Sequence, residues 1–245
     1  MPFVGPLDPY TTNLSGAWSV ARRLLSSYTG PLIRVRRSSD NTELDIGYLA
    51  NGSLDEASLL TFCGAGNGFI ATVYGQTGTS NLSNGNVAAE ESMIVDTGAV
   101  LVSAGFPGML YDGTDDWIQA TVAVAMVEFF ISHATGASAN NGQYLIDGRP
   151  DLADSFVFDN IIIGGNWINC WKDGVATTLD GAGVFDAVHH LTTLQGSGNT
   201  PSAFFLMRFN GFVTACRAGY IREIATYSAA LSNADRDGVE AALMP

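Results

Sequence analysis

The sequence predicts an all-β protein built as a two-layer sandwich of sheets, with a few short helices at its periphery. The chain of 245 residues has 28 glycines and only 14% charged residues, which suits many strands joined by tight turns. Residues 121–132, TVAVAMVEFFIS, carry Glu128 as their single charge. So apolar a run indicates a central strand covered on both faces, although periodicity alone leaves a buried helix open. Shorter strands around it would complete the sandwich.

The N-terminal third is predicted to contain an arm, two helices and two strands. Three prolines remove backbone donors within residues 1–14, so this segment is an extended arm and residues 15–245 form a single sandwich domain. Ser15 as an N-cap, followed by an apolar stripe at helical spacing, predicts a first helix. The capping box of Ser53 and Glu56 predicts a second one. The predicted strands cover residues 32–37 and 69–74.

The C-terminal end is predicted to be a long strand followed by a helix. Residues 219–228 alternate between apolar and polar, and Ser232 with an acid three residues on caps a helix that runs through Leu243. Asp-Gly pairs at Asp112 and Asp173 supply the positive φ that tight hairpin turns need. Further strands are predicted near residues 143–146, 155–163, 166–172, 187–195 and 203–214.

Charge and composition exclude several classes of function. The formal net charge of −13 disfavours binding to phosphate backbones and to anionic membranes. No run reaches the ~18 apolar residues of a membrane span, so membrane insertion is not expected. The first residues lack a signal peptide's basic and apolar regions, which predicts synthesis in a cytoplasm without export. Three cysteines without metal-like spacing indicate buried thiols.

Five arginines fall within sixteen positions near the N-terminus. Such a cluster suggests a contact surface for acidic groups, for instance on a neighbouring copy of the chain; the alternative is a solvated face paired with Asp40, Glu43 and Asp45. Together with two apolar residues of the arm, four of these arginines form the predicted assembly surface. Its members are Phe3, Val4, Arg22, Arg23, Arg34 and Arg36; Arg37 completes the cluster.

Glu128 is the candidate catalytic residue. A lone carboxylate on a buried strand either loses its hydration, which raises its pKa as a glycosidase acid requires, or lies on a solvated face. A retaining hydrolase needs a second carboxylate about 5 Å away and an inverting one about 6.5–9.5 Å away. Asp116 or Asp147 reaches Glu128 only by tertiary contact. A structural or ligand-binding Glu128 is the alternative.

Asp112, Asp115 and Asp116 are candidate ligands for Ca²⁺. Hard cations take clustered carboxylates and carbonyls. The alternative is turn chemistry, in which Asp112 and Gly113 bend a hairpin while the other two carboxylates stay hydrated. No other cofactor is expected.

Aromatic side chains are the candidates for contact with sugar rings. Trp117, Trp171 and Tyr144 can stack on a sugar, although aromatic residues of a sandwich also build its core. His189 and His190 lie in an alternating segment, so one points inward and one outward; without zinc spacing around them, structural roles are expected.

The block of residues 28–78, from YTGPLIRVRR to VYGQTG, resembles the start of the catalytic domain of fungal α-L-arabinofuranosidase B, a concanavalin-like sandwich. It also resembles bacteriophage and prophage virion proteins that share this block. The enzymes have a second cysteine soon after the position of Cys63, and a carboxylate where Gly75 precedes Gln76. Both are missing here, so the resemblance does not imply enzyme activity. Gln76 is retained and is a candidate ligand-binding residue.

The second half resembles laminin-G-like members of the concanavalin superfamily. Residues 110–117, LYDGTDDW, are similar to their turn between strands, residues 171–175, WKDGV, to their Asx-Gly hairpin, and the strand-then-helix ending to their C-terminus. This resemblance implies a concanavalin-like jelly roll across the whole chain.

These resemblances predict a non-enzymatic phage virion protein, either a tail or fibre protein or a capsid decoration. It would reside in the virion as a homo-oligomer, contact other virion proteins, and expose a lectin-like sandwich for attachment to host glycans or for particle assembly. The first alternative is a carbohydrate-binding lectin module, which predicts sugar affinity that depends on Trp117 or Trp171. The second is a glycoside hydrolase related to arabinofuranosidases, which predicts turnover that depends on Glu128.

Overall fold

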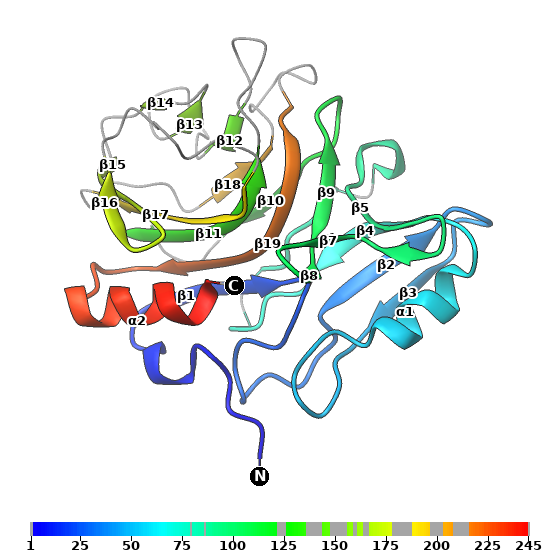
Figure 1. Cartoon of the computed structure of the whole chain (residues 1–245), viewed down its shortest axis with the longest axis horizontal. Coiled ribbons are helices and arrows are strands. Elements are labelled where there is room, and N and C mark those ends of the chain that lie inside the picture. Colours follow the sequence, from blue (N-terminus) through cyan, green and yellow to red (C-terminus); the bar gives the residue numbers. More distant parts are fainter. Residues whose placement is uncertain are drawn as a thin grey trace.

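The protein is a sandwich of two antiparallel β-sheets, as a computed structural model shows (Figure 1). The all-β prediction is therefore confirmed. The structure describes residues 2–78, 80–85, 87–121, 126–135, 144–147, 156–158, 161–163, 167–177, 188–196, 203–207 and 216–244.

The larger sheet extends across the molecule, and β19 is its junction. One edge of β19 pairs with β11, while β1 and β9 share the other edge. Further along, β6 (Ala99–Val100) pairs with β5. The strand order is β16 (Val175–Thr177), β15 (Trp167–Lys172), β17 (His190–Gly196), β11 (Glu128–Thr135), β19 (Ala218–Tyr227), β9 (Met109–Asp112), β5 (Met93–Asp96), β4 (Gly68–Val73), β2 (Ile33–Arg37) and β3 (Glu43–Ile46), with β1 (Leu14–Ser19) beside β19.

The smaller sheet covers one face of β11 and its neighbours (Figure 1). A separate hairpin, β7 (Val102–Ser103) with β8 (Phe106–Pro107), leads into β9. The helical segments are η1 (Asp8–Tyr10), α1 (Glu56–Cys63), η2 (Ala88–Glu90) and α2 (Asn233–Leu243). Neither α1 nor α2 is long and apolar enough to cross a membrane. The strands of the smaller sheet are, in order, β10 (Ile118–Thr121), β18 (Ala203–Leu206), β12 (Tyr144–Asp147), β13 (Phe156–Phe158) and β14 (Ile161–Ile163).

The described part of the apolar run, from Met126 on, is covered on both faces over residues 128–132, but the run 121–132 is not one strand. The Phe129 ring meets Phe204 of the smaller sheet edge-on at 5.1 Å, and the Phe130 ring meets Tyr227 at 5.6 Å in a second core under α2. However, β10 ends at Thr121 in the smaller sheet and β11 begins at Glu128 in the larger one. The predicted central strand thus falls into two strands of different sheets, and residues 122–125 lie outside the described residues.

The helix predicted from Ser15 is wrong, because this segment forms β1. Its backbone pairs with β19, with Trp18 opposite Ile224. Gly16 is required there, since a Cβ at that position would lie 2.1 Å from the Trp18 ring. The apolar residues of β1 that suggest helical spacing are buried on both faces instead, and pairing with a distant strand overrides local propensity.

Several other predicted elements are confirmed, but the strand predicted over 155–163 is two strands, β13 and β14, and residues 208–214 of another lie outside the described residues. Helix α1 uses Asp55 as its N-cap, which accepts from the Ser58 amide at 3.1 Å, so the predicted cap at Ser53 is two residues too early. Helix α2 begins after Ser232, whose Oγ accepts from the Asp235 amide at 3.1 Å, as predicted. Asp173 and Gly174 both have positive φ in the β15–β16 turn, and so does Gly113.

The N-terminal arm packs on its own sandwich. Leu7 is completely buried and its amide donates to the Leu24 carbonyl at 3.0 Å. Its neighbours in this second core include Val239 and Leu243 of α2. The Tyr227 hydroxyl donates to the Tyr10 carbonyl at 3.0 Å. The arm and α2 therefore together cover the outer face of β11 and β19.

Candidate functional site

A pocket of about 260 Å³ lies where β4, β5 and β9 meet, and we call it the acidic pocket. Apolar side chains form much of its wall, and three carboxylates line it, from Glu91, Asp112 and Asp116. Pockets that combine an apolar wall with a few converging polar groups are the usual ligand sites of proteins. The apolar lining residues are Phe69, Ala88, Ala89, Met93 and Leu110.

Asp116 is the most perturbed carboxylate of this pocket. It is only 7% exposed, and burial raises its pKa to about 7, with the negative charges of Asp112, Asp115 and Glu91 adding to the effect. The hydrogen bond from the Asp112 amide, 2.9 Å from Asp116 Oδ2, opposes the shift. A carboxyl group with this pKa holds its proton at neutral pH often enough to act as a general acid.

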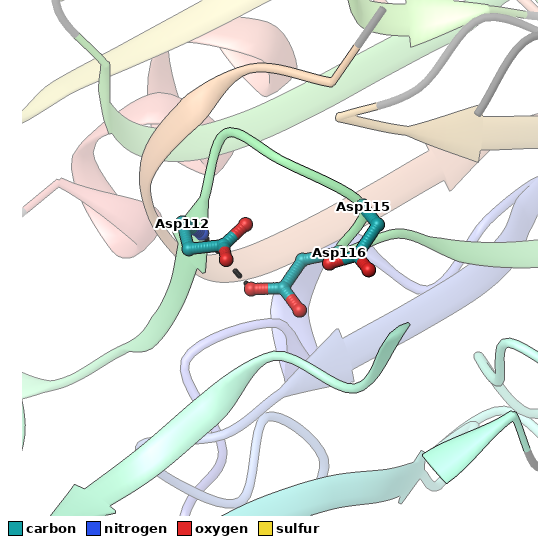
Figure 2. Close-up of side chains that lie close together, drawn as sticks. All are labelled: Asp112, Asp115 and Asp116. Carbon is teal, nitrogen blue, oxygen red and sulfur yellow. Dashed lines mark hydrogen bonds between the residues drawn. The ribbon is translucent and has the colours of Figure 1, made fainter. Parts of the chain in front are cut away.

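The turn between β9 and β10 brings three carboxylates together (Figure 2). Asp112 Oδ1 accepts from the Thr114 amide at 2.7 Å, and Gly113 takes a φ of +80° that lets the chain reverse. One oxygen from each of Asp112, Asp115 and Asp116 then lies within 4.8 Å of the others. This arrangement fits two chemistries, a pair of glycosidase carboxylates or a hard cation site. Calcium therefore stays a prediction.

Glu91 is a site residue that the sequence analysis missed. It is 5% exposed, and Arg36 Nε lies 2.7 Å from its Oε2. Burial raises the Glu91 pKa, while the hydrogen bond and charge of Arg36 lower it. The sequence signal that could have identified it is the acidic pair Glu90 and Glu91 shortly before the apolar strand β5, because an acidic residue near the start of a strand lies next to buried surface.

Glu128 lies away from this pocket. It is completely buried on the α2 side of β11, where Gln195 Nε2 donates to its Oε1 at 2.8 Å. Burial raises its pKa. Glu240 of α2 is buried in the same layer, and its pKa is raised for the same reason. The structure therefore places the predicted catalytic residue under a helix, without an opening toward a substrate among the described residues.

The predicted sugar-binding residues are not gathered in one place. The Trp117 indole N–H donates to the Glu90 carboxylate next to the acidic pocket, whereas the Trp171 ring lies on β15 with the Arg236 guanidinium 3.9 Å above it. Gln76 is 3% exposed, and its amide bridges the Arg22 carbonyl and the Leu24 amide. Tyr144 starts β12, and its side chain lies outside the described residues.

Only Arg34 and Arg37 pair with acids that the alternative interpretation named, while Arg22 and Arg36 pair with buried acids elsewhere in the chain. Arg34 lies 2.7 Å from Asp45, Arg36 2.7 Å from Glu91, and Arg37 2.6 Å from Asp40. Arg22 lies 2.7 Å from Glu223. Arg23 instead stacks on two rings, those of Phe3 at 4.0 Å and Tyr48 at 4.7 Å. Val4, the other predicted assembly residue of the arm, is 71% exposed.

His189 and His190 face opposite ways, as alternation predicted. His189 Nδ1 is 2.8 Å from Ser103 Oγ, and its Nε2 is 2.6 Å from Ser132 Oγ. Burial lowers the His189 pKa to about 4, with the charge of Arg222 adding to the effect. His190 Nδ1 lies 2.6 Å from Asp173 Oδ2 on the other face. No acid orients the ring of His189, so Ser132 and His189 do not form a hydrolase triad within the described residues.

The chain is thus an antiparallel β-sandwich with a pocket that holds closely spaced carboxylates, one of which has a raised pKa. Comparisons with known proteins make this more specific. Residues 8–105 match the family model described as α-L-arabinofuranosidase B, catalytic. The N-terminal part of the chain thus resembles that catalytic domain, which confirms the resemblance inferred from residues 28–78.

Individual relatives agree. An α-L-arabinofuranosidase B from Emericella nidulans is 40% identical over 211 residues, which are 80% of this chain and 38% of the relative. An α-L-arabinofuranosidase from Hypocrea jecorina is 38% identical over 80 residues, or 31% of this chain and 16% of the relative. The chain therefore spans well under half the length of these relatives.

Solved structures share the fold. An arabinofuranosidase in complex with arabinofuranosyl-α-1,2-xylobiose superimposes with a TM-score of 0.63 at 14% identity, over 98% of this chain and 64% of the other. A GH54 α-L-arabinofuranosidase soaked with a cyclic sulfate inhibitor gives a TM-score of 0.64 at 15% identity, with the same coverage. These likenesses show a common sandwich over nearly the whole chain.

The interpretation as a non-enzymatic phage virion protein is wrong. The matching family model and these relatives are arabinofuranosidases, and the relatives come from fungi. The same findings overturn the predicted virion localisation, the virion and homo-oligomer partners, and the exclusion of enzyme activity. The cysteine and the carboxylate that these enzymes have near the positions of Cys63 and Gly75 are missing from this chain, but the block around them still matches the enzymes.

Proposed function

We propose that the chain is a glycoside hydrolase domain that cleaves α-L-arabinofuranosidic bonds. The observation that carries the proposal is the match of residues 8–105 to the catalytic part of α-L-arabinofuranosidase B. The Emericella nidulans relative extends the similarity to 80% of the chain. The proposal concerns this segment, because the chain covers less than half of such relatives.

The acidic pocket supplies the chemistry that the proposal needs. Asp116, with its raised pKa, would donate a proton to the glycosidic oxygen as the bond to the anomeric carbon breaks. Asp112 would attack that carbon from the other side. One oxygen of each carboxyl group lies within 4.8 Å of the other, so the two groups are near neighbours, as in retaining enzymes, where the separation is about 5–5.5 Å. The attack would give an ester between Asp112 and the arabinose. Water would then hydrolyse this ester, with Asp116 accepting the proton of the water as the base.

The shape and lining of the pocket agree with a small substrate group. A volume of about 260 Å³ is at the lower end of ligand pockets and suits one sugar ring. Arg36, held against Glu91, supplies the neighbouring positive charge and fixes one wall of the pocket. The Arg36 guanidinium also lies 4.7 Å from the centre of the Phe69 ring, and Phe69 and Leu110 add apolar surface to the lining of the pocket.

The test is the release of 4-nitrophenol from 4-nitrophenyl α-L-arabinofuranoside by the full chain. We expect turnover of this furanoside and none of the corresponding α-L-arabinopyranoside. Asp116→Asn is expected to lower kcat by about 100-fold or more, the size of a general-acid contribution. The matched control is Asp237→Asn, because the Asp237 side chain is 68% exposed on α2.

The two parts of the proposal fail separately. Absence of furanoside hydrolysis by the unmodified chain, with its fold verified by circular dichroism, would refute the hydrolase proposal. If the Asp116→Asn variant hydrolyses the furanoside as fast as the unmodified chain, the hydrolase proposal stands, but Asp116 is not the general acid.

A further inference from the structure

A second pocket lies on another part of the molecule, between the N-terminal arm and the β7–β8 hairpin. Its volume is about 300 Å³, and its walls come from the arm, from the connection after β1, from the loop at residues 51–53 and from Phe106. We call it the arginine pocket, because Arg22 and Arg23 line it side by side. It shares no lining residue with the acidic pocket.

Two guanidinium groups, those of Arg22 and Arg23, line this pocket, and that of Arg222 lies against the ring of Phe106, another lining residue. Arg222 lies behind Phe106, with its guanidinium 4.9 Å from the ring centre. It is 2% exposed, and neither its Nε nor its Nη1 has a hydrogen-bond partner in the described part of the chain. The same holds for the buried Nε of Arg23. Buried donors without partners are costly, and an acceptor that reaches them recovers that cost.

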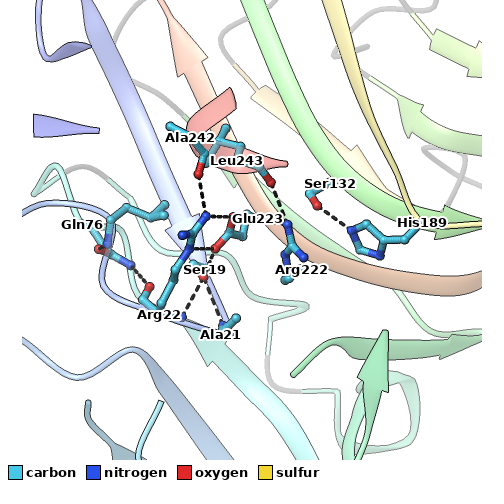
Figure 3. Close-up of polar contacts among 11 residues, drawn as sticks. Ser19, Ala21, Arg22, Gln76, Ser132, His189, Arg222, Glu223, Ala242 and Leu243 are labelled. Atoms are coloured by element: carbon cyan, nitrogen blue, oxygen red, sulfur yellow. Dashed lines mark hydrogen bonds and ion pairs between the residues drawn. The ribbon is translucent and has the colours of Figure 1, made fainter. Parts of the chain in front are cut away.

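The local charge favours an anion. Glu223 accepts from Arg22 Nε at 2.7 Å and from its Nη2 at 3.0 Å, and lies 3.7 Å from Arg222 (Figure 3). The second acid near these arginines is Asp8, which interacts electrostatically with Arg23. Three cations thus face two carboxylates, in a chain whose net charge is −13. His189, which contacts the same layer, is neutral because burial lowers its pKa to about 4.

The backbone fixes two of these cations in place. Arg22 Nη2 donates to the Ala242 carbonyl at 2.6 Å, and Arg222 Nη2 donates to the Leu243 carbonyl at 2.7 Å (Figure 3). The carbonyls at the end of α2 carry its negative dipole end, which suits cations. A site held in this way requires little reorganisation when a ligand binds.

The remaining walls favour a ligand with an apolar body. Phe106 is 39% exposed and Val4 is 71% exposed, and the Phe3 ring completes this side. Asn51 offers donors, because its carbonyl oxygen already accepts from the Ser53 amide at 3.1 Å and hydroxyl at 2.8 Å. A carboxylate on a planar or aliphatic ring would meet the arginines with its oxygens and the two phenylalanines with its ring.

We propose that the arginine pocket binds a small organic carboxylate with an apolar ring. Arg22 and Arg23 hold the carboxylate, and Phe3 and Phe106 contact the ring. The site is independent of the acidic pocket and of hydrolysis.

The test is isothermal titration calorimetry of the full chain with benzoate. We expect saturable binding at one site, which weakens as salt concentration rises because surface charges are screened. Methyl benzoate, which has the same ring without the charge, should not bind. No benzoate binding at millimolar concentration would overturn the proposal, as would equal affinity for inorganic phosphate, since the apolar walls would then contribute nothing.

Variants locate the site. Arg23→Gln is expected to weaken benzoate binding by about tenfold or more, as loss of a charge-assisted contact does, whereas Arg37→Gln, at a cation paired with Asp40, should leave it unchanged. Unchanged affinity in Arg23→Gln would refute the assignment. If Arg23→Gln fails to fold, Val4→Glu serves instead, because this exposed position tolerates a charge that repels the carboxylate; Val4→Ala is its control.

Discussion

The acidic pocket and the layer under α2 both raise the pKa of carboxyl groups by burial, yet they differ in access. Asp116 lines a pocket that a ligand can enter. Glu128 and Glu240 lie between the larger sheet and α2, and are 0% and 1% exposed. The Oε2 atoms of both lack a hydrogen-bond partner within the described residues. A raised pKa marks a candidate acid, but access decides whether it can meet a substrate.

The largest expected effect is on turnover. If hydrolysis occurs in the acidic pocket, Asp116→Asn lowers kcat for the arabinofuranoside by about 100-fold or more, while Glu128→Gln changes it by less than about twofold. Steady-state kinetics of both variants side by side measure the contrast. The reverse pattern would move the chemistry to the α2 layer and restore the catalytic role first predicted for Glu128.

The next effect is on stability, and it tests how firmly α2 covers Glu128. Leu243 is completely buried in the second core, so Leu243→Ala is expected to lower the free energy of unfolding by about 2–5 kcal/mol. Urea denaturation measures the change. Met244→Ala, at the half-buried neighbouring position, should cost much less. Equal losses for both would indicate that α2 is loosely docked.

A third effect concerns pH. Burial raises the Glu128 pKa above its ordinary 4.5, so the folded state binds this proton more tightly than the unfolded state does. The stabilising contribution is complete below pH 4.5 and is lost as the pH rises through the folded pKa. Glu128→Gln removes the ionisation, so the free energy of unfolding of the variant should rise relative to that of the unmodified chain as the pH increases from 4 to 8. Urea melts across this range measure it, and parallel pH curves would contradict the burial.

The smallest expected effect is that of calcium on the acidic pocket. If Asp112, Asp115 and Asp116 bind the ion, Ca²⁺ at about ten times its dissociation constant stabilises the fold by about 1.4 kcal/mol. Thermal denaturation with calcium and with EDTA detects the shift, Asp115→Asn should abolish it, and Mg²⁺ should give less. The α2 layer should not respond, so an unchanged shift in Asp115→Asn would place the ion elsewhere.

The sequence predicted those parts of the fold that depend on local chemistry. Ser232 caps α2, Asp173 and Gly174 form a hairpin turn, and β2 forms within the predicted residues 32–37, although Arg36 is buried beside Glu91. It failed where distant partners decide. Segment 14–19 is a strand because β19 lies beside it, and local spacing carries no information about a partner about two hundred residues away.

The candidate site was predicted only in part, for a related reason. Asp112, Asp115 and Asp116 are close in sequence, so their grouping was visible. Glu91 and Arg36 are fifty-five positions apart and meet only because β4 lies between their strands. The burial of Glu128 under α2 likewise depends on a helix more than one hundred residues later, so its inaccessibility could not be read from the apolar run around it.

The contact between the arm and α2 also constrains the order of folding. Leu7, Trp18 and Leu24 belong to cores that are completed by residues after position 203. In a chain that leaves the ribosome N-terminus first, these cores and the pairing of β1 with β19 therefore stay incomplete until translation is nearly two hundred residues further on. Contacts of such long range make folding slow. The nascent chain is thus exposed to aggregation and to chaperone binding for most of its synthesis.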